Sequence, residues 1–186
     1  MFSTERIQLR KVTEEDAAIY HKWRTNPIVM ENTSPHLDTY TLKDTEVFIQ
    51  SIVSSENSKS YIIQHKEDDA PIGIVSLINI DLKNRNAECI IDIGNEAYWG
   101  LGFGKEAMSL LLDFCFLELN LHKVCLRVFS FNERAIKLYE RLGFEKEGEQ
   151  REQMFRNGSW HGIVMMAIFQ EGYLVKEDSF GNEGYV

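Results

Sequence analysis

The spacing of hydrophobic and polar residues changes along the chain, and each change marks a predicted element. Short segments rich in apolar and β-branched residues predict strands at 7–11, 59–65, 72–81, 85–93 and 123–129. Apolar residues three and four positions apart predict helices from Thr13 to about Arg24, over 41–54, and from about 102 to Leu119. The region 25–40 holds two of the three prolines and is expected to be a loop.

The last third of the chain has equally clear start and stop signals. Asn132 predicts the N-cap of a helix that ends at Gly143. The pair Asn157-Gly158 lies between two strand-like segments, 147–155 and 160–169, and predicts a β-hairpin. We therefore expect one mixed α+β domain over residues 1–175, followed by a flexible tail over 176–186.

Composition narrows the class of protein. The 186 residues are 44% apolar, which suits one domain with a sizeable core, and no apolar run approaches the ~20 residues of a membrane span. The net charge of −9 argues against nonspecific nucleic-acid binding and is compatible with a cationic substrate. The three cysteines lie in apolar runs, as expected in a reducing cytoplasm, and the five histidines lack ligand spacing, so no metal site is predicted.

The chemistry of the chain is concentrated between residues 87 and 144. An apolar run ending at Ile93 leads to glycines at 100, 102 and 104, after which a helical pattern begins. A glycine turn that opens a helix presents unpaired backbone N–H groups and the positive end of the helix dipole. This arrangement favours an anionic group such as a pyrophosphate.

This segment resembles the GNAT acyl-CoA N-acetyltransferases. Their pyrophosphate loop, Gln/Arg-x-x-Gly-x-Gly/Ala, aligns with residues 99–104, except that Trp99 replaces Gln or Arg. A Trp at that position is similar to the RimJ/RimL-like branch, as is the opening 4–10 with Asp16, Trp23 and Asn26-Pro27. The resemblance covers residues 3–174. It implies a twisted, mostly antiparallel sheet of about seven strands flanked by about four helices.

The resemblance also implies acetyl-CoA as co-substrate and a set of residues that hold it. The backbone of Ile91 and Ile93 would pair with pantetheine amides, and Asn132 would bond the pantetheine or phosphate arm in addition to its capping role. The remaining cofactor-binding residues form the loop itself: Trp99, Gly100, Leu101, Gly102, Phe103, Gly104 and Lys105.

Two residues are candidates for the acetyl-transfer chemistry. Tyr139 shares a helix face with inward-packing residues, so it is either a core aromatic or, as the resemblance implies, a general acid or thiol orienter beside the CoA sulfur. Glu88 lies on the strand that leads to the glycine loop, where burial would raise its pKa and suit it as a base for the ammonium. An ion pair with Arg85 or Lys83 is the alternative role of Glu88.

The acceptor is left open by the sequence. The downstream half, including residues 120–123 and 155–158, is also similar to bacterial spermidine acetyltransferases, but their acidic motif is absent from residues 30–35. The acceptors that fit are a protein N-terminus, a polyamine, an amino sugar or an aminoglycoside. A homodimer is compatible with this interpretation, and a non-catalytic acyl-CoA-binding module is the competing class of function.

Overall fold

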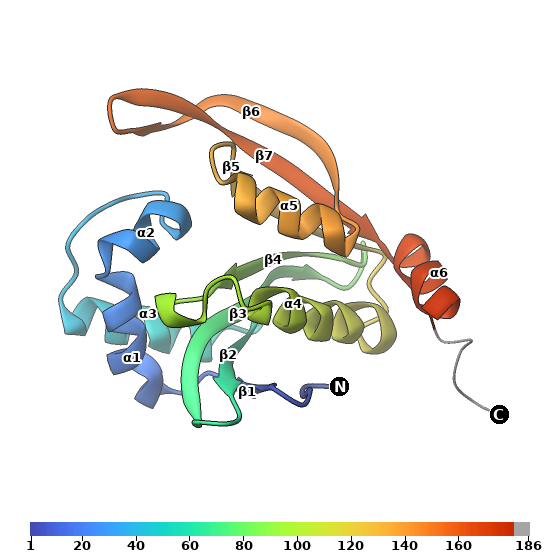
Figure 1. Cartoon of the computed structure of the whole chain (residues 1–186), viewed down its shortest axis with the longest axis horizontal. Helices are drawn as coiled ribbons and strands as arrows, with labels where there is room; N and C mark the ends of the chain where they lie inside the picture. The colour runs from blue at the N-terminus through green and yellow to red at the C-terminus, as the bar shows by residue number, and fades with distance from the viewer. Residues whose placement is uncertain (181–186) are drawn as a thin grey trace. The chain divides into compact units, whose positions relative to one another are not determined.

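The computed structural model describes residues 1–180, with side chains described to residue 175 (Figure 1). Seven strands follow the order β1-β2-β3-β4-β5-β7-β6 in one sheet, in which β4 and β5 are parallel and the other pairings with a determined register are antiparallel. The strands are β1 (Ile7–Lys11), β2 (Lys59–His65), β3 (Ala70–Asp81), β4 (Asn86–Asp92), β5 (Lys123–Phe129), β6 (Glu145–Arg156) and β7 (Ser159–Phe169). The predicted mixed α+β fold with a mostly antiparallel sheet is confirmed.

Within residues 1–180, six α-helices and three short helical segments accompany the sheet. The α-helices are α1 (Ala17–Arg24), α2 (Pro27–Thr33), α3 (Leu42–Val53), α4 (Phe103–Asp113), α5 (Glu133–Leu142) and α6 (Gln170–Phe180). The short segments are the 3-10 turns η1 (Glu14–Asp16) and η2 (Glu96–Tyr98) and the π-helical η3 (Phe114–Glu118), which continues α4. The contacts divide the chain into a first unit, residues 1–80 with 89–111, and a second unit, residues 81–88 with 112 onward.

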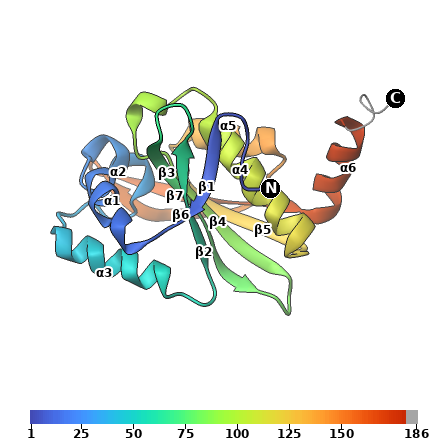
Figure 2. The ribbon, with the colours of Figure 1, turned by 90° about the horizontal axis from the view of Figure 1, so that it is seen from below.

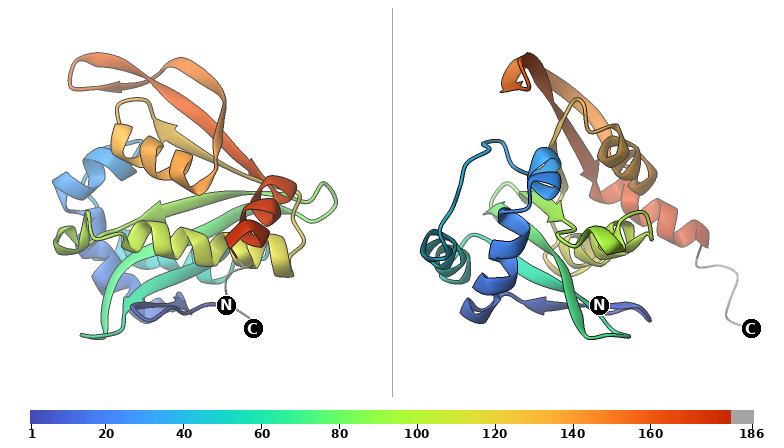
Figure 3. Two further views of the ribbon diagram at one scale, coloured as in Figure 1. Left: turned by 45° about the vertical axis from the view of Figure 1, so that its right-hand side comes forward. Right: turned by 60° about the vertical axis from the view of Figure 1, so that its left-hand side comes forward.

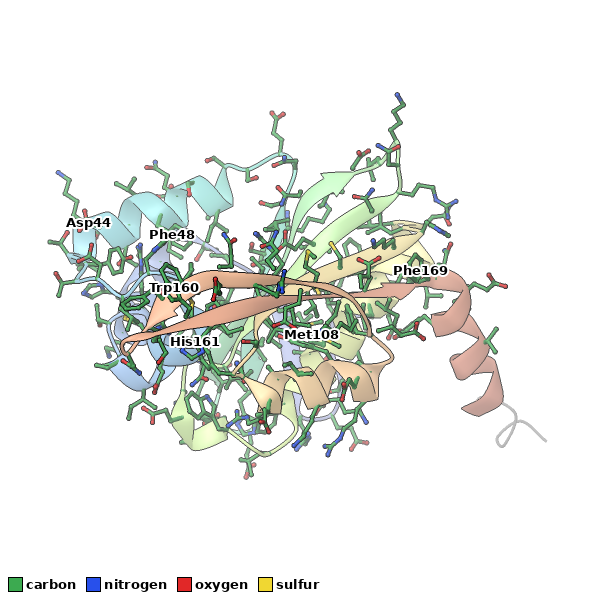
Figure 4. All side chains as sticks on the ribbon, turned by 90° about the horizontal axis from the view of Figure 1, so that it is seen from above. Asp44, Phe48, Met108, Trp160, His161 and Phe169 are labelled. Carbon is green, nitrogen blue, oxygen red and sulfur yellow. The ribbon has the colours of Figure 1, made fainter. Side chains whose placement is uncertain are left out.

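In the first unit, α1 and α3 cover one face of β2 and β3 while α4 lies on the other side (Figures 2 and 3). The helical face buries Trp23 and Ile49 against Ile62 and Ile74 of the strands, which removes apolar surface from water. Helix α3 starts at a capping box, in which Asp44 Oδ2 accepts from the Thr41 N–H at 2.8 Å. Figure 4 labels Asp44 and Phe48, which lie one turn apart on this helix.

In the second unit, a long hairpin carries the edge of the sheet. Asn157 (φ +50°) and Gly158 (φ +78°) form its two-residue turn, as the Asn-Gly pair predicts. Figure 4 shows Trp160 and His161 at the turn end of β7, with Phe169 at the opposite end. Helix α5 has Asn132 as its N-cap and Gly143 (φ +103°) as its C-cap, so both predicted caps are confirmed.

Two helices differ from the sequence prediction. Region 25–40 contains α2, because Asn26 caps the helix by accepting from the Ile28 N–H at 3.0 Å and Pro27 occupies its first turn. Helix α6 includes residues 176–180, of which only the backbone is described, and residues 181–186 lie outside the described residues, so the flexible tail stays a prediction. Among the described residues, no helix is both long enough and apolar enough to cross a membrane.

Candidate functional site

The glycine loop has the geometry of a phosphate-binding helix start. Gly100 (φ +76°) and Gly102 (φ +89°) occupy the left-handed region, which a residue with a Cβ adopts only at a cost. Helix α4 begins at Phe103, and the first intrahelical bond runs from the Glu106 N–H to the Gly102 carbonyl at 3.1 Å. The amides of Phe103, Gly104 and Lys105 therefore have no carbonyl within the helix to bond. These three donors and the dipole form an anion cradle.

The residues just before the loop are fixed by side-chain hydrogen bonds. Trp99 donates from Nε1 to the Ile93 carbonyl at 2.7 Å, which ties the loop to the chain that leaves β4. Tyr98 donates from its hydroxyl to Asp68 in the β2–β3 turn, and His65 bonds the same carboxylate at 2.6 Å. The Tyr98 hydrogen bond, followed by that of His65, lowers the pKa of Asp68 to about 2. Trp99 thus has a structural role at the position where the family pattern has Gln or Arg.

Arg6 holds the other side of the loop. Its guanidinium donates from Nη1 to the Leu101 carbonyl at 3.2 Å and pairs with Glu106 of α4 at 2.5 Å. The same group lies 4.5 Å from the centre of the Phe103 ring, and Thr4 also donates to Glu106. We call this set of contacts the loop clamp. It joins the segment just before β1 to the cradle across about 95 positions of sequence.

The chain at the end of β4 packs tightly in the first unit. A Cβ at Gly73 of β3 would lie 2.3 Å from the Asp92 carbonyl, and a Cβ at Gly94 would lie 2.2 Å from the Trp23 ring. Gly73 and Gly94 therefore allow β3 and α1 to approach the segment that includes Ile91 and Ile93. Burial raises the pKa of Asp92 to about 7, and this carboxylate makes no hydrogen bond or ion pair with the described residues.

Glu88 has a different partner from those expected. Its carboxylate accepts from Arg127 Nε on β5 at 2.8 Å, and only 14% of its side chain is exposed. Arg85 is bonded instead to the Asn120 carbonyl at 2.7 Å and to the Gln170 side chain at 2.9 Å. The expected pairing with Arg85 or Lys83 is therefore wrong, since the parallel register brings Glu88 beside Cys125 and so near Arg127.

The second unit places Asn132 and Tyr139 on α5. Asn132 caps the helix, accepting from the Ala135 N–H at 3.2 Å, so its predicted structural role is confirmed. Tyr139 is buried, with its ring 5.8 Å from that of Phe144 in an edge-to-face contact. The described contacts fit both the core role and the catalytic role of Tyr139.

Several polar residues were not singled out by sequence reasoning. Asp92, Tyr20, Arg24 and Tyr40 come from three separate segments of the first unit, and charge interactions link Tyr20 to the other three. Two acidic residues of the region 25–40, Glu31 and Asp38, are both exposed. No local motif marks the Tyr20 group, because its members meet only in the folded chain.

Comparisons with known proteins decide the family. The family profile of the acetyltransferase (GNAT) domain matches residues 6–145. The chain belongs to the GNAT acetyltransferase family. It is an N-acetyltransferase with acetyl-CoA as co-substrate, as predicted, and it transfers the acetyl group to an amine.

The chain is similar to relatives along nearly its whole length. It is 32% identical over 183 residues to the spermidine N(1)-acetyltransferase of Escherichia coli strain K12, covering 97% of this chain and 95% of the relative. Over a shorter stretch of 103 residues it is 33% identical to the putative ribosomal N-acetyltransferase YdaF of Bacillus subtilis, covering 55% of this chain and 56% of the relative. The RimJ/RimL-like branch stays a prediction.

Solved structures confirm the fold. The Vibrio cholerae spermidine N-acetyltransferase in complex with CoA and spermine superposes with a TM-score of 0.84 at 29% identity, covering 92% of this chain and 99% of that one. A dodecameric structure of spermidine N-acetyltransferase from the same organism superposes with a TM-score of 0.79 at 29% identity, covering 93% of this chain and 99% of that one.

Proposed function

We propose that this protein acetylates a primary amine by direct transfer from acetyl-CoA within a ternary complex. The observation that carries the proposal is the cradle at the start of α4, whose two left-handed glycines clear the approach to its amides. In this proposal the pyrophosphate binds the amides of residues 100–105, and Lys105, which is exposed, adds positive charge. The backbone at Ile91 and Ile93 pairs with pantetheine.

The proposed chemistry forms an N–C bond and breaks the C–S bond of the thioester. The amine must lose a proton before it attacks, and the departing thiolate must gain one. We assign the second proton to the Tyr139 hydroxyl. Glu88 is our candidate for draining the first proton, directly or through water, and its ion pair with Arg127 is the competing role. An N–H of the Ile91–Ile93 segment would stabilise charge on the thioester oxygen.

The acceptor has two supported classes. Likeness to spermidine acetyltransferases over 97% of the chain favours a polyamine, whereas the RimJ/RimL-like features of the sequence favour an N-terminal amine. The test is a panel of spermidine, short peptides, amino sugars and aminoglycosides, scored by CoA release from acetyl-CoA. Release that no amine accelerates would contradict an amine acetyltransferase and favour a non-catalytic CoA-binding module.

We also propose that the protein self-associates and acts in the cytoplasm. A homodimer or a larger homo-oligomer is suggested by the dodecamer described for the Vibrio cholerae protein. The three cysteines are thiols outside any disulfide, of which Cys89 and Cys115 are buried, and they suit a reducing compartment. Light scattering during size-exclusion chromatography would measure the mass of the assembly. A monomeric mass at micromolar concentration would contradict the proposed self-association.

A further inference from the structure

The guanidinium of Arg24, at the end of α1, makes no hydrogen bond to the described residues. Its Cζ lies 3.6 Å from the centre of the Tyr40 ring and 4.9 Å from that of Phe48. These aromatic contacts hold the cation in place. Nη1 is buried and donates no hydrogen bond to the described residues. A buried donor without a protein partner is costly, so we expect an acceptor atom from outside the protein, from water or a ligand, at this position.

A carboxylate without a hydrogen bond or ion pair to the described residues, that of Asp92, interacts electrostatically with Tyr20, as Arg24 does. Asp92 ends β4, two residues before Gly94, on which the Trp23 ring of α1 rests. The Tyr20 ring stacks on the Phe48 ring with centroids 5.6 Å apart and meets the Trp23 ring edge-on at 6.2 Å. It therefore lies between Phe48, which contacts Arg24, and Trp23, which packs near the end of β4. Burial, and then the negative charge of Asp92, raise the pKa of Tyr20, while Arg24 acts in the opposite direction. The Tyr20 hydroxyl therefore lies within electrostatic range of both charged groups.

The carboxylate of Asp92, the guanidinium of Arg24 and the phenol of Tyr20 can bind different polar groups of one ligand. A carboxylate accepts hydrogen bonds from an ammonium, a guanidinium donates to a carbonyl, hydroxyl or carboxylate oxygen, and a phenol does either. A cation confined beside the site would repel a second ammonium of the same ligand. A molecule with positive charge along its whole length is therefore a poor match for this cluster.

We propose that Tyr20, Arg24 and Asp92 form the acceptor subsite, and that it takes an amine bearing a hydrogen-bond-accepting oxygen close to the nitrogen. Asp92 receives the ammonium and Arg24 the oxygen. The inference rests on the proposed function and specifies its substrate class: an amino-acid or peptide-like amine in preference to a polyamine. It adds a binding step and leaves the acetyl-transfer step unchanged.

The experiment compares matched amines on matched variants. L-alaninamide carries the oxygen, isopropylamine lacks it, and spermidine tests the all-cationic ligand. Arg24→Met keeps an apolar stem between Tyr40 and Phe48 but removes every donor. Lys22→Met removes an exposed cation from the same helix and is the control.

We expect Arg24→Met to raise the KM for L-alaninamide at least tenfold, to leave that for isopropylamine within twofold, and to lower that for spermidine. Asp92→Asn should raise the KM for all three amines, and Lys22→Met should change none. Equal effects of Arg24→Met on L-alaninamide and isopropylamine, or no effect on either, would overturn the proposal. Comparing each amine across variants removes differences in amine basicity.

Folding and function are separated by two further measurements. Calorimetric CoA binding reports whether each variant folds, since the loop clamp that shapes the CoA cradle includes none of these residues. If Arg24→Met does not bind CoA, Arg24→Leu, which also removes every donor, replaces it, and unchanged selectivity in that variant counts against the proposal. If no amine accelerates CoA release by the unmodified protein, the proposed function fails. If amines do so and the variants do not change selectivity, only the subsite fails.

Discussion

The cofactor loop and the acceptor cluster lie in the same unit, yet their polar groups are treated in opposite ways. Around the loop, the side chains of Trp99, Tyr98 and Arg6 each donate a hydrogen bond to another part of the protein. In the cluster, the Arg24 guanidinium and the Asp92 carboxylate have no such partners among the described residues. The polar side chains of the cofactor loop are hydrogen-bonded without a ligand, whereas in our proposal those of the acceptor cluster bond the ligand.

The difference follows from how each ligand is recognised. A pyrophosphate is bound by backbone amides, so its site requires a rigid backbone and its side chains serve to hold that backbone. An acceptor is recognised by side chains whose donors and acceptors must remain available. The two regions therefore make separable predictions: damage to the loop should affect CoA, and damage to the cluster should affect the amine.

The largest effect is expected from Tyr139→Phe, which belongs to neither region. It removes the hydroxyl and keeps the buried ring against Phe144. If the hydroxyl protonates the thiolate, turnover should fall by about 10²–10⁴-fold. Stopped-flow or steady-state CoA release measures this, and CoA affinity and amine KM should stay within about twofold. Normal turnover would assign Tyr139 to the core alone.

Gly102→Val should cost about 10²-fold in CoA affinity. Valine is strained at φ +89°, and its branches would block approach to the α4 amides. Isothermal titration calorimetry with CoA measures the loss. Leu101→Ala is the control, because the Leu101 side chain is exposed and its carbonyl, which Arg6 binds, is retained. Equal CoA affinity in Gly102→Val and the unmodified protein would place the pyrophosphate elsewhere.

The same contrast explains which features the sequence could predict. The cradle was predictable because its glycines and its helix are contiguous, so local rules of backbone geometry apply. The loop clamp was not, because Arg6 reaches Leu101 from 95 positions away. The acceptor cluster was missed for the same reason, since the significance of Asp92 depends on what packs around it.

Two errors arose from short-range signals with more than one meaning. The two prolines in the region 25–40 predict a loop, although Asn followed by Pro, as in Asn26-Pro27, is also the N-cap and first turn of a helix. For Glu88 the sequence suggests the nearby cations Arg85 and Lys83 as partners, but the parallel pairing of β4 with β5 supplies Arg127. A sequence without strand order gives no way to choose that partner.

The unpartnered carboxylate of the cluster should make stability depend on pH. The folded-state pKa of Asp92, about 7, is raised from 3.8, so its contribution is fully present below 3.8 and is lost as pH rises through 7. The side chain of Asp92→Asn stays neutral at every pH. Its free energy of unfolding should therefore exceed that of the unmodified protein by about 2–4 kcal/mol at pH 8, a difference that shrinks towards pH 5. Urea unfolding across this range measures it.

Asp38→Asn, at an exposed position, should show no such pH-dependent margin and is the control. A margin for Asp92→Asn that is constant from pH 5 to pH 8 would mean that the carboxylate is solvated or paired in the folded protein. The acceptor cluster would then resemble the cofactor loop, and the contrast between them would fail.

Glu88→Gln tests whether a paired carboxylate also acts in the chemistry. If Glu88 drains a proton, turnover should fall about tenfold at pH 7 and recover at high pH, where the amine deprotonates unaided. Arg127→Gln breaks the same 2.8 Å ion pair but keeps the carboxylate. Matching pH–rate profiles in the two variants would show that only the ion pair matters and would remove Glu88 from the mechanism.

The smallest effect is expected from Tyr98→Phe, which removes one hydrogen bond at the loop and leaves its backbone intact. Because the Tyr98 hydroxyl is the main cause of the lowered pKa of Asp68, that pKa should rise from about 2 towards 3.8, as measured by NMR titration of the Asp68 carboxyl carbon. His65 still bonds Asp68, and Arg6 still holds Leu101, so the KM for acetyl-CoA should rise only about two- to fivefold. The amine KM should not change. A shift in amine KM without one in acetyl-CoA KM would mean that this hydrogen bond serves acceptor binding and not the cofactor loop.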